Sequence, residues 1–297
     1  MTLDNANVFD HLNKIITDCL TVLRSQRDLL RAKNVYSKQR RIDVQQGFVR
    51  FEGGLLVYLK DIQHRIIFDG FEIQSIDTFV ELCEEVLKYT DTPLSQFALR
   101  TLIEISFDKF KILFDDKLSL EEKNKYKAIC LLADYGFMTN PSHTNEYNKL
   151  FIEFSPVFST KQKKLLEDLH IAATQGLEKQ TLVRKTRKLI GAVQDILSKK
   201  IDILPLFNLS KIESMDSALS HILHGDFILI SSLFLPLRKK SNKLRTYYTL
   251  MIVVVNAINC VGAMVKDVEL HKQIDSINDE FKAIGTYIKQ HWEEIEK

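Results

Sequence analysis

The feature that most constrains the fold is a run of twenty residues without a charged side chain, Thr246–Val265 (TYYTLMIVVVNAINCVGAMV). A helix of that length can span a membrane, and the basic residues before it would suit a cytoplasmic flank. However, Asn256 and Asn259 share one helical stripe with Thr249 and Ala263, at spacings of three, four and seven. We therefore expect a buried central apolar helix near 246–265, with Asn256 hydrogen-bonded inside and no membrane span. A membrane helix is the alternative.

Helix-breaking residues are scarce, with 10 glycines and 5 prolines among 297 residues. Apolar residues make up 45% of the chain and charged residues 27%, a balance typical of a folded globular protein. No long alternation of apolar and polar residues indicates a sheet, although the glycines at 47, 53 and 54 are compatible with a turn or short strand. We expect an all-α fold: one large multi-helix bundle over 1–297, or two sub-bundles at 1–140 and 155–297 with a boundary in 136–156.

Three helix starts carry recognisable capping residues. Thr92-Pro93 is typical of an N-cap followed by proline at the first helical position. Ser119 with Glu122, and Ser159 with Gln162, match the capping box. The expected helices cover about 5–35, 55–68, 76–90, 93–114, 119–135, 178–199, 212–224, 243–266 and 268–291, with another beginning at 159.

The cysteines at 19, 83, 130 and 260 lie far apart and form no C-x-x-C pair. Their spacing matches neither a zinc site nor a small disulfide framework, so we expect reduced, mostly buried thiols and no metal or other cofactor. The first ten residues include two aspartates, where a signal peptide would need basic residues and then an apolar run. A cytoplasmic location is therefore expected.

Basic residues are concentrated in one part of the chain, although the net charge is only +2. Between 159 and 245 there are 16 Lys/Arg against 8 Asp/Glu, whereas the remainder has 25 against 31. Three clusters account for most of the surplus: Lys161, Lys163 and Lys164; Arg184, Lys185, Arg187 and Lys188; and Arg238, Lys239, Lys240, Lys243 and Arg245. A cationic face attracts RNA or DNA through phosphate contacts, and we assign the second cluster to nucleic-acid binding. The alternative is an ordinary solvated helix surface.

Arg100 and Glu104 lie four residues apart on an expected helix, with Phe97 and Phe107 on the same side. Opposite charges at this spacing usually form a surface pair. Beside apolar neighbours the pair would be half buried and would need further partners. The pattern is compatible with a structural pair and with a functional site.

A second polar group closes another expected helix at 217–226 (SALSHILHGD). His221 and His224 stand three residues apart before Gly225, a common C-terminal capping residue. The helix dipole favours a cationic imidazole there, which suits both capping and acid–base chemistry. With Asp226 as the one further local ligand, the group is too small for a metal site.

The two groups together carry a resemblance to a protein family. Arg100–Glu104 (RTLIE) has the form R-[ST]-L-x-E, and Leu219–Gly225 (LSHILHG) has the form L-S-x-x-x-H-G. In these motifs the chain resembles an uncharacterised all-helical bacterial family of HEPN-like type, over about 79–265. The resemblance implies a helical bundle with a polar pocket, often dimeric. It also implies a place in toxin–antitoxin or phage-defence systems, where HEPN domains frequently cleave RNA.

The chain departs from the catalytic HEPN pattern, in which an arginine precedes a histidine by four to six intervening residues. Lys164 with His170 and Lys266 with His271 have this spacing, but the base is lysine. A metal-independent ribonuclease needs a cation to hold the phosphate and a histidine to move the 2′-hydroxyl proton. Arg100 would supply the cation only if the fold brings it to His224.

We therefore expect a cytoplasmic HEPN-like helical protein that binds RNA, or cleaves it as a metal-independent ribonuclease, with Arg100, Glu104 and His224 in one pocket. RNA, a second copy of the chain or another protein are the expected partners. Two other interpretations stay open: a non-catalytic helical protein–protein interaction module, and a secreted bacterial effector.

Overall fold

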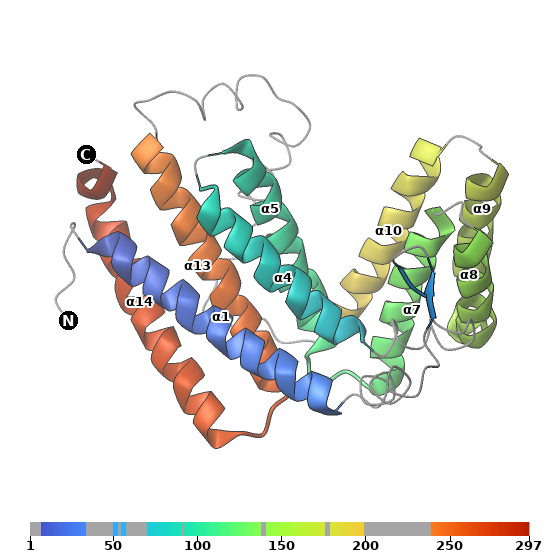
Figure 1. The fold of residues 1–297 in the computed structure, drawn as a ribbon, viewed down its shortest axis with the longest axis horizontal. Helices are drawn as coiled ribbons and strands as arrows, with labels where there is room; N and C mark the ends of the chain where they lie inside the picture. Colours follow the sequence, from blue (N-terminus) through green and yellow to red (C-terminus); the bar gives the residue numbers. More distant parts are fainter. Residues whose placement is uncertain are drawn as a thin grey trace. The chain divides into compact units, whose positions relative to one another are not determined.

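The structure is a computed structural model that describes residues 7–33, 50–52, 55–57, 70–90, 92–137, 141–175, 179–198 and 239–296. Over these residues the fold is all-α, as predicted, apart from one short hairpin (Figure 1). Its strands β1 (Arg50–Glu52) and β2 (Leu55–Val57) pair antiparallel, with Phe51 opposite Leu56. The helix expected over 55–68 is therefore wrong at its start. The two strands lie before and after Gly53-Gly54, in the stretch that was compatible with a turn or short strand.

The chain divides into two compact units, each assembled from separate stretches of sequence. Unit 1 comprises Met1–Asp28, Ser75–Asp116 and Asp202–Lys297, and unit 2 comprises Leu29–Gln74 and Lys117–Ile201. This partition differs from the continuous sub-bundles 1–140 and 155–297. The stretch 136–156, expected as a boundary, contains a helix that packs inside unit 2.

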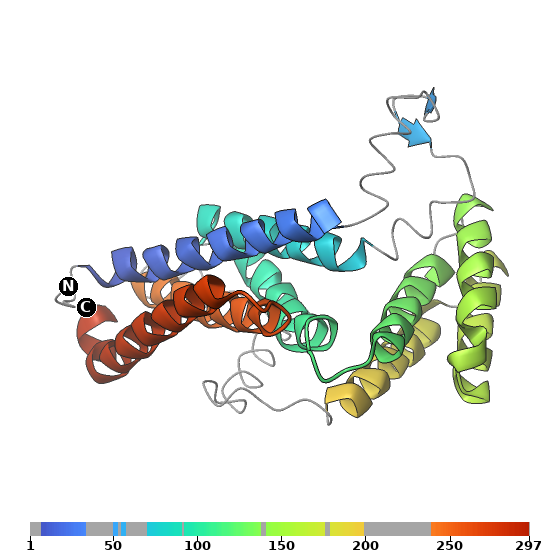
Figure 2. The ribbon, with the colours of Figure 1, turned by 90° about the horizontal axis from the view of Figure 1, so that it is seen from below.

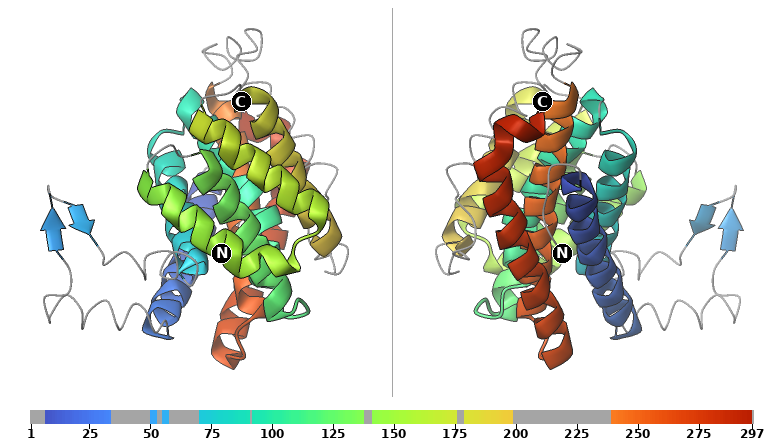
Figure 3. Two further views of the ribbon diagram at one scale, coloured as in Figure 1. Left: turned by 90° about the vertical axis from the view of Figure 1, so that its right-hand side faces the viewer. Right: turned by 90° about the vertical axis from the view of Figure 1, so that its left-hand side faces the viewer.

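Unit 1 is built around one long apolar helix. Its elements are most of α1 (Val8–Lys33), most of α4 (Phe71–Lys88), α5 (Pro93–Ile103), the π-helix η1 (Glu104–Phe110), α6 (Lys111–Leu113), α13 (Lys239–Ala263) and α14 (Val268–Glu296). α13 packs against α5, η1 and α14, and Figure 3 shows α1, α13 and α14 side by side. The helix predicted over 93–114 is thus helical almost to its predicted end, but with a π-helix inside it.

The uncharged run forms the core of unit 1, as the sequence predicted. Leu250, Met251 and Val254 are fully buried, and Asn256 is 5% exposed. Among the described residues, Lys243–Ala263 is the one helix long and apolar enough to cross a membrane, and 67% of its apolar window is buried inside the protein. This burial is the property expected of a core helix.

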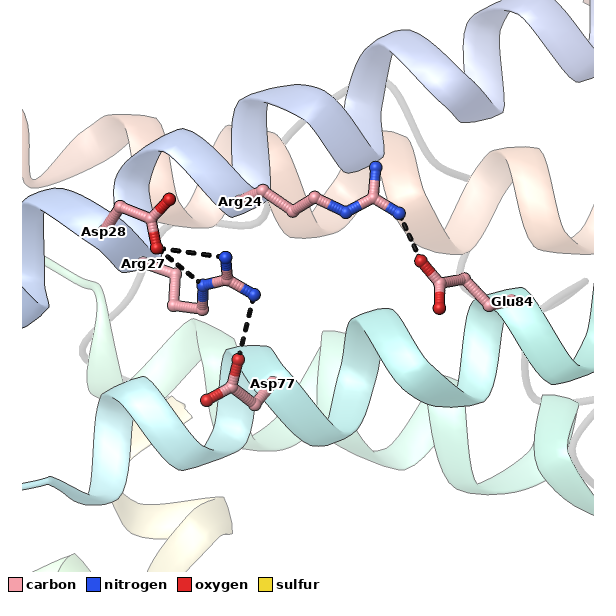
Figure 4. A network of polar contacts seen from close by, with 5 residues as sticks. All are labelled: Arg24, Arg27, Asp28, Asp77 and Glu84. Atoms are coloured by element: carbon pink, nitrogen blue, oxygen red, sulfur yellow. Dashed lines mark hydrogen bonds and ion pairs between the residues drawn. The ribbon is translucent and has the colours of Figure 1, made fainter.

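Ion pairs connect α1 to its neighbours in unit 1. Figure 4 shows Arg27 of α1 bonded to Asp28 and, at 3.1 Å, to Asp77 of α4. A second ion pair joins the same two helices: Arg24, about one turn before Arg27 on α1, pairs with Glu84, about two turns after Asp77 on α4. These partly exposed ion pairs connect α1 to α4 but contribute little free energy individually.

Unit 2 is a four-helix assembly in the described part of the chain. It contains α7 (Leu120–Phe137), α8 (Pro141–Phe154) with the short 3-10 turn η2 (Ser155–Val157), α9 (Thr160–Gln175) and α10 (Lys179–Ser198). α7 packs against α8, α9 and α10, and α9 packs against α10; Figure 2 shows α7 beside α10. At the centre, the fully buried Tyr126 accepts a hydrogen bond from Gln194 through its hydroxyl, at 3.1 Å.

The predicted capping boxes are confirmed in unit 2. The Ser119 backbone N–H donates to the Glu122 carboxylate at 3.0 Å, and the Glu122 N–H donates to the Ser119 hydroxyl at 3.3 Å. Ser159 and Gln162 make the same reciprocal pair, at 3.0 and 3.3 Å. In α5 the proline start is confirmed, but Thr92 donates its hydroxyl backwards to the Tyr89 carbonyl instead of capping the helix.

Candidate functional site

The first predicted site residues, Arg100 and Glu104, meet in an ion pair at the junction of α5 and η1. Arg100 Nη2 lies 2.8 Å from Glu104 Oε1, with the two side chains 24% and 46% exposed. The pair is half-buried, as expected for charges beside apolar neighbours. Glu104 is also the first residue of the π-helix, so the geometry of the pair depends on that helix.

The third residue of the predicted pocket, His224, lies outside the described residues, as do His221 and the rest of Leu219–Gly225. A shared pocket of Arg100, Glu104 and His224 therefore stays a prediction. What the described residues contain is a cation already held by a carboxylate on its own helix. Phosphate binding at Arg100 would have to displace Glu104 or use the other guanidinium nitrogens.

The predicted nucleic-acid-binding residues lie on α10 in unit 2. Arg187 and Lys188 are exposed, whereas the side chains of Arg184 and Lys185 are outside the described set. On the neighbouring α9, Lys161 and Lys164 are exposed and Lys163 is half-buried. We call the four exposed cations Lys161, Lys164, Arg187 and Lys188 the α9–α10 basic surface.

The third basic cluster belongs to the other unit. Lys239, Lys240, Lys243 and Arg245 begin α13, and Arg238 is outside the described residues. The Lys243 ammonium lies 5.2 Å from the centre of the Phe9 ring and 5.9 Å from that of Tyr247. This lysine therefore lies over aromatic rings of its own unit, and the basic residues concentrated between 159 and 245 in the sequence are divided between the two units.

One arrangement in unit 2 was not singled out by the sequence. The ring of Tyr147 on α8 stacks between Phe151 of its own helix and His170 of α9, at centroid distances of 5.8 and 4.0 Å. Burial lowers the pKa of His170, which favours the neutral imidazole. Burial, aided by the charge of Glu167, raises the pKa of Tyr147.

The Tyr147 hydroxyl is buried and has no hydrogen-bond partner among the described residues. A buried hydroxyl without a partner is unfavourable by about 1–3 kcal/mol, so the stack must be retained by its ring packing. The sequence pointed to His170 only through its spacing from Lys164, and it gave no indication that His170 contacts Tyr147. The stack joins two helices, so no local sequence motif predicts it.

The cysteines fit the expected inert thiols. Cys19, Cys83 and Cys130 are buried, Cys260 is half-buried, and none of the four forms a disulfide. Burial raises the pKa of Cys19 and Cys83 well above the ordinary range and that of Cys260 to about 12, which suppresses the reactive thiolate. The described residues contain no cluster of three His, Cys, Asp or Glu side chains placed to hold a metal ion.

Comparisons with protein-family models, with curated proteins and with solved structures find no match for this chain. The HEPN-like relationship therefore rests on the two short motifs alone and stays a prediction. Any function has to be argued from the surfaces and side chains described above.

Proposed function

We propose that the protein binds RNA through the α9–α10 basic surface of unit 2. The observation that carries the proposal is that α10, with exposed Arg187 and Lys188, packs against α9, with exposed Lys161 and Lys164. Within the described part of the chain, none of these four cations takes part in an ion pair or a hydrogen bond. Their charges are therefore available to phosphate groups.

Acidic side chains share the same helices and limit the strength of this surface. Glu167 and Asp168 on α9, and Asp195 on α10, are all exposed. A mixed surface of this kind binds phosphate weakly at each contact, so binding requires several contacts at once. The proposal is accordingly for a sequence-independent, salt-sensitive interaction.

A more specific proposal is that the protein also cleaves RNA as a metal-independent ribonuclease. In this proposal Arg100 holds a phosphate and His224 takes the proton of the 2′-hydroxyl. The substitution His224→Ala would then abolish cleavage of labelled RNA and leave the affinity for RNA unchanged. If the variant instead loses about 1–2 kcal/mol of stability and keeps its activity per folded molecule, His224 is a capping or packing residue.

The experiment that tests RNA binding is a titration of a labelled single-stranded RNA at a series of salt concentrations. With about four phosphate contacts, the logarithm of the association constant should fall against the logarithm of salt concentration with a slope of about −3. No binding at low salt, or binding that salt does not weaken, would contradict the proposal.

A second candidate function is a helical protein–protein interaction module, and exposed isoleucines on the same unit favour it. Ile152 of α8 is 75% exposed and Ile196 of α10 is 60% exposed. Large exposed apolar side chains are a common property of protein-binding surfaces. Absence of RNA binding in the titration, with a loss of self-association in Ile152→Lys or Ile196→Lys variants, would favour this candidate.

A further inference from the structure

The chain from α5 to α6 buries a stripe of residues at a constant spacing of four. The stripe consists of Ala98, Leu102, Ser106, Phe110 and Phe114, each 8% exposed or less. In a regular α-helix each residue turns by about 100°, so residues four apart drift by about 40° around the axis at each step. Over four steps the drift reaches about 160°, which would turn Phe114 away from the face that holds Ala98.

The π-helix η1 removes this conflict. Its hydrogen bonds span five residues instead of four, so it holds more residues in each turn than an α-helix. Glu104–Phe110 lies in the middle of the stripe, where the wider turn cancels much of the drift. As a result Phe110 packs against Phe79 at 5.1 Å and against Phe114 at 5.2 Å between ring centres.

A π-helix is rarer than an α-helix because it is less favourable by itself, so contacts elsewhere must stabilise it. Asn256 of α13 provides such a contact. Its side-chain amide donates to the carbonyl oxygen of Ser106 and to the Ser106 hydroxyl, at 3.0 Å in each case. The same hydroxyl donates to the Val253 carbonyl at 2.8 Å, and both Asn256 and Ser106 are buried.

We infer that Asn256 and Ser106 form a register latch that holds residues 104–110 in the π-helical form. In a π-helix each backbone carbonyl accepts from the N–H five residues ahead, and the Asn256 amide adds a second donor to the buried Ser106 carbonyl. Together with the bond to the Ser106 hydroxyl, this contact favours the backbone position that the π turn gives Ser106. The latch fixes the rotation of every residue after the π turn against α13, and it sets the backbone at Glu104, where the Arg100–Glu104 pair lies. This inference is independent of RNA binding.

The first test is the substitution Asn256→Leu, which keeps a similar volume and removes the donor. Hydrogen–deuterium exchange of peptides that cover 104–110 should become at least about tenfold faster, since the π-helix loses the two hydrogen bonds that Asn256 donates to Ser106. The matched control is Asn259→Leu on the same helix, which breaks a different polar contact and should leave exchange at 104–110 unchanged. If Asn256→Leu prevents folding, Asn256→Ser removes the reach of the amide with less disturbance.

The second test removes the π turn itself. The residue to delete is Asp108, which is exposed and lies inside η1. The deletion shortens the step from Ser106 to Phe110 from four residues to three, so the segment can continue as a regular α-helix with the stripe on one face. In the deletion background the amide has no π turn to stabilise, so Asn256→Leu should lower the Tm by at most about half of its effect in the intact chain, where about 5 °C is expected.

Two results would overturn the inference. One is unchanged exchange at 104–110 in Asn256→Leu, which would mean that the π-helix does not need the amide. The other is an equal loss of Tm from Asn256→Leu with and without Asp108, because a latch specific to the π turn must couple the two changes.

Discussion

The side-chain amides of Asn259 and Asn278 bond to each other in both directions. Asn259 Nδ2 donates to Asn278 Oδ1 at 2.9 Å, and Asn278 Nδ2 donates to Asn259 Oδ1 at 3.0 Å. The pair joins α13 to α14, and Asn278 is 7% exposed. Such a two-way amide contact fixes the register of two helices, because a shift of either helix breaks both bonds of the pair.

Removal of one amide of this pair should destabilise unit 1. We expect Asn278→Leu to lower the free energy of unfolding by about 1–3 kcal/mol, since the amide of Asn259 then loses its cross-helix partner in a partly buried position. The double variant with Asn259→Leu should lose less than the sum of the two single losses. Denaturant unfolding of the four proteins in this cycle measures the coupling, and additive losses would mean that the bonds are not energetically linked.

The stability of unit 2 should depend on pH through His170. Burial lowers the pKa of the folded imidazole, whereas the unfolded value is about 6.5. Below that pH the unfolded chain binds the extra proton more readily, so stability falls as the pH decreases through about 6.5 towards the lower folded value. Above it the contribution is constant.

The variant His170→Phe isolates this effect, because it keeps a ring to stack on Tyr147 and removes the titrating group. Unfolding experiments between about pH 8 and pH 5 should show a smaller loss of stability in the variant than in the wild-type chain. Parallel curves for the two proteins would show that His170 titrates equally in the folded and unfolded states.

Two helical glycines should respond differently to alanine. A Cβ at Gly191 of α10 would meet nothing within 4 Å, whereas a Cβ at Gly262 of α13 would collide with Ile274 Cδ1 of α14. We expect Gly191→Ala to raise the free energy of unfolding by about 0.5–1 kcal/mol through helix propensity. Gly262→Ala should be less stable than Gly191→Ala by about 1 kcal/mol or more, because Ile274 must shift. Chemical denaturation of both variants checks the difference; equal gains would mean that α13 and α14 are not in close contact at Gly262.

Features with a local cause were predictable from the sequence. The capping boxes at Ser119 and Ser159 involve residues three apart, and the burial of α13 follows from its own uncharged run. Asn256 was expected to be buried and hydrogen-bonded from its place on that run, and this is confirmed. In each case the information lies within a few helical turns.

Features with a distant cause were not predictable in the same way. The π-helix depends on a contact between Ser106 and Asn256, which come from different helices, although the spacing-four stripe was a visible signal. The stack of Tyr147 on His170 likewise joins two helices without a motif. The two units are discontinuous, so no composition boundary marks them. Of the predicted site, the Arg100–Glu104 contact followed from its spacing of four, whereas the proximity of His224 depends on tertiary structure.

The α9–α10 basic surface is tested most directly by charge reversal. The variant Arg187→Glu/Lys188→Glu should weaken single-stranded RNA binding by about tenfold or more at low salt, and should flatten the salt slope by about 1–2, because two phosphate contacts are lost. The control is Lys266→Glu/Lys289→Glu, which makes the same change of net charge at exposed positions of unit 1. The account predicts that the control binds RNA like the wild-type chain. Equal affinity of the Arg187/Lys188 variant and its control would contradict the account.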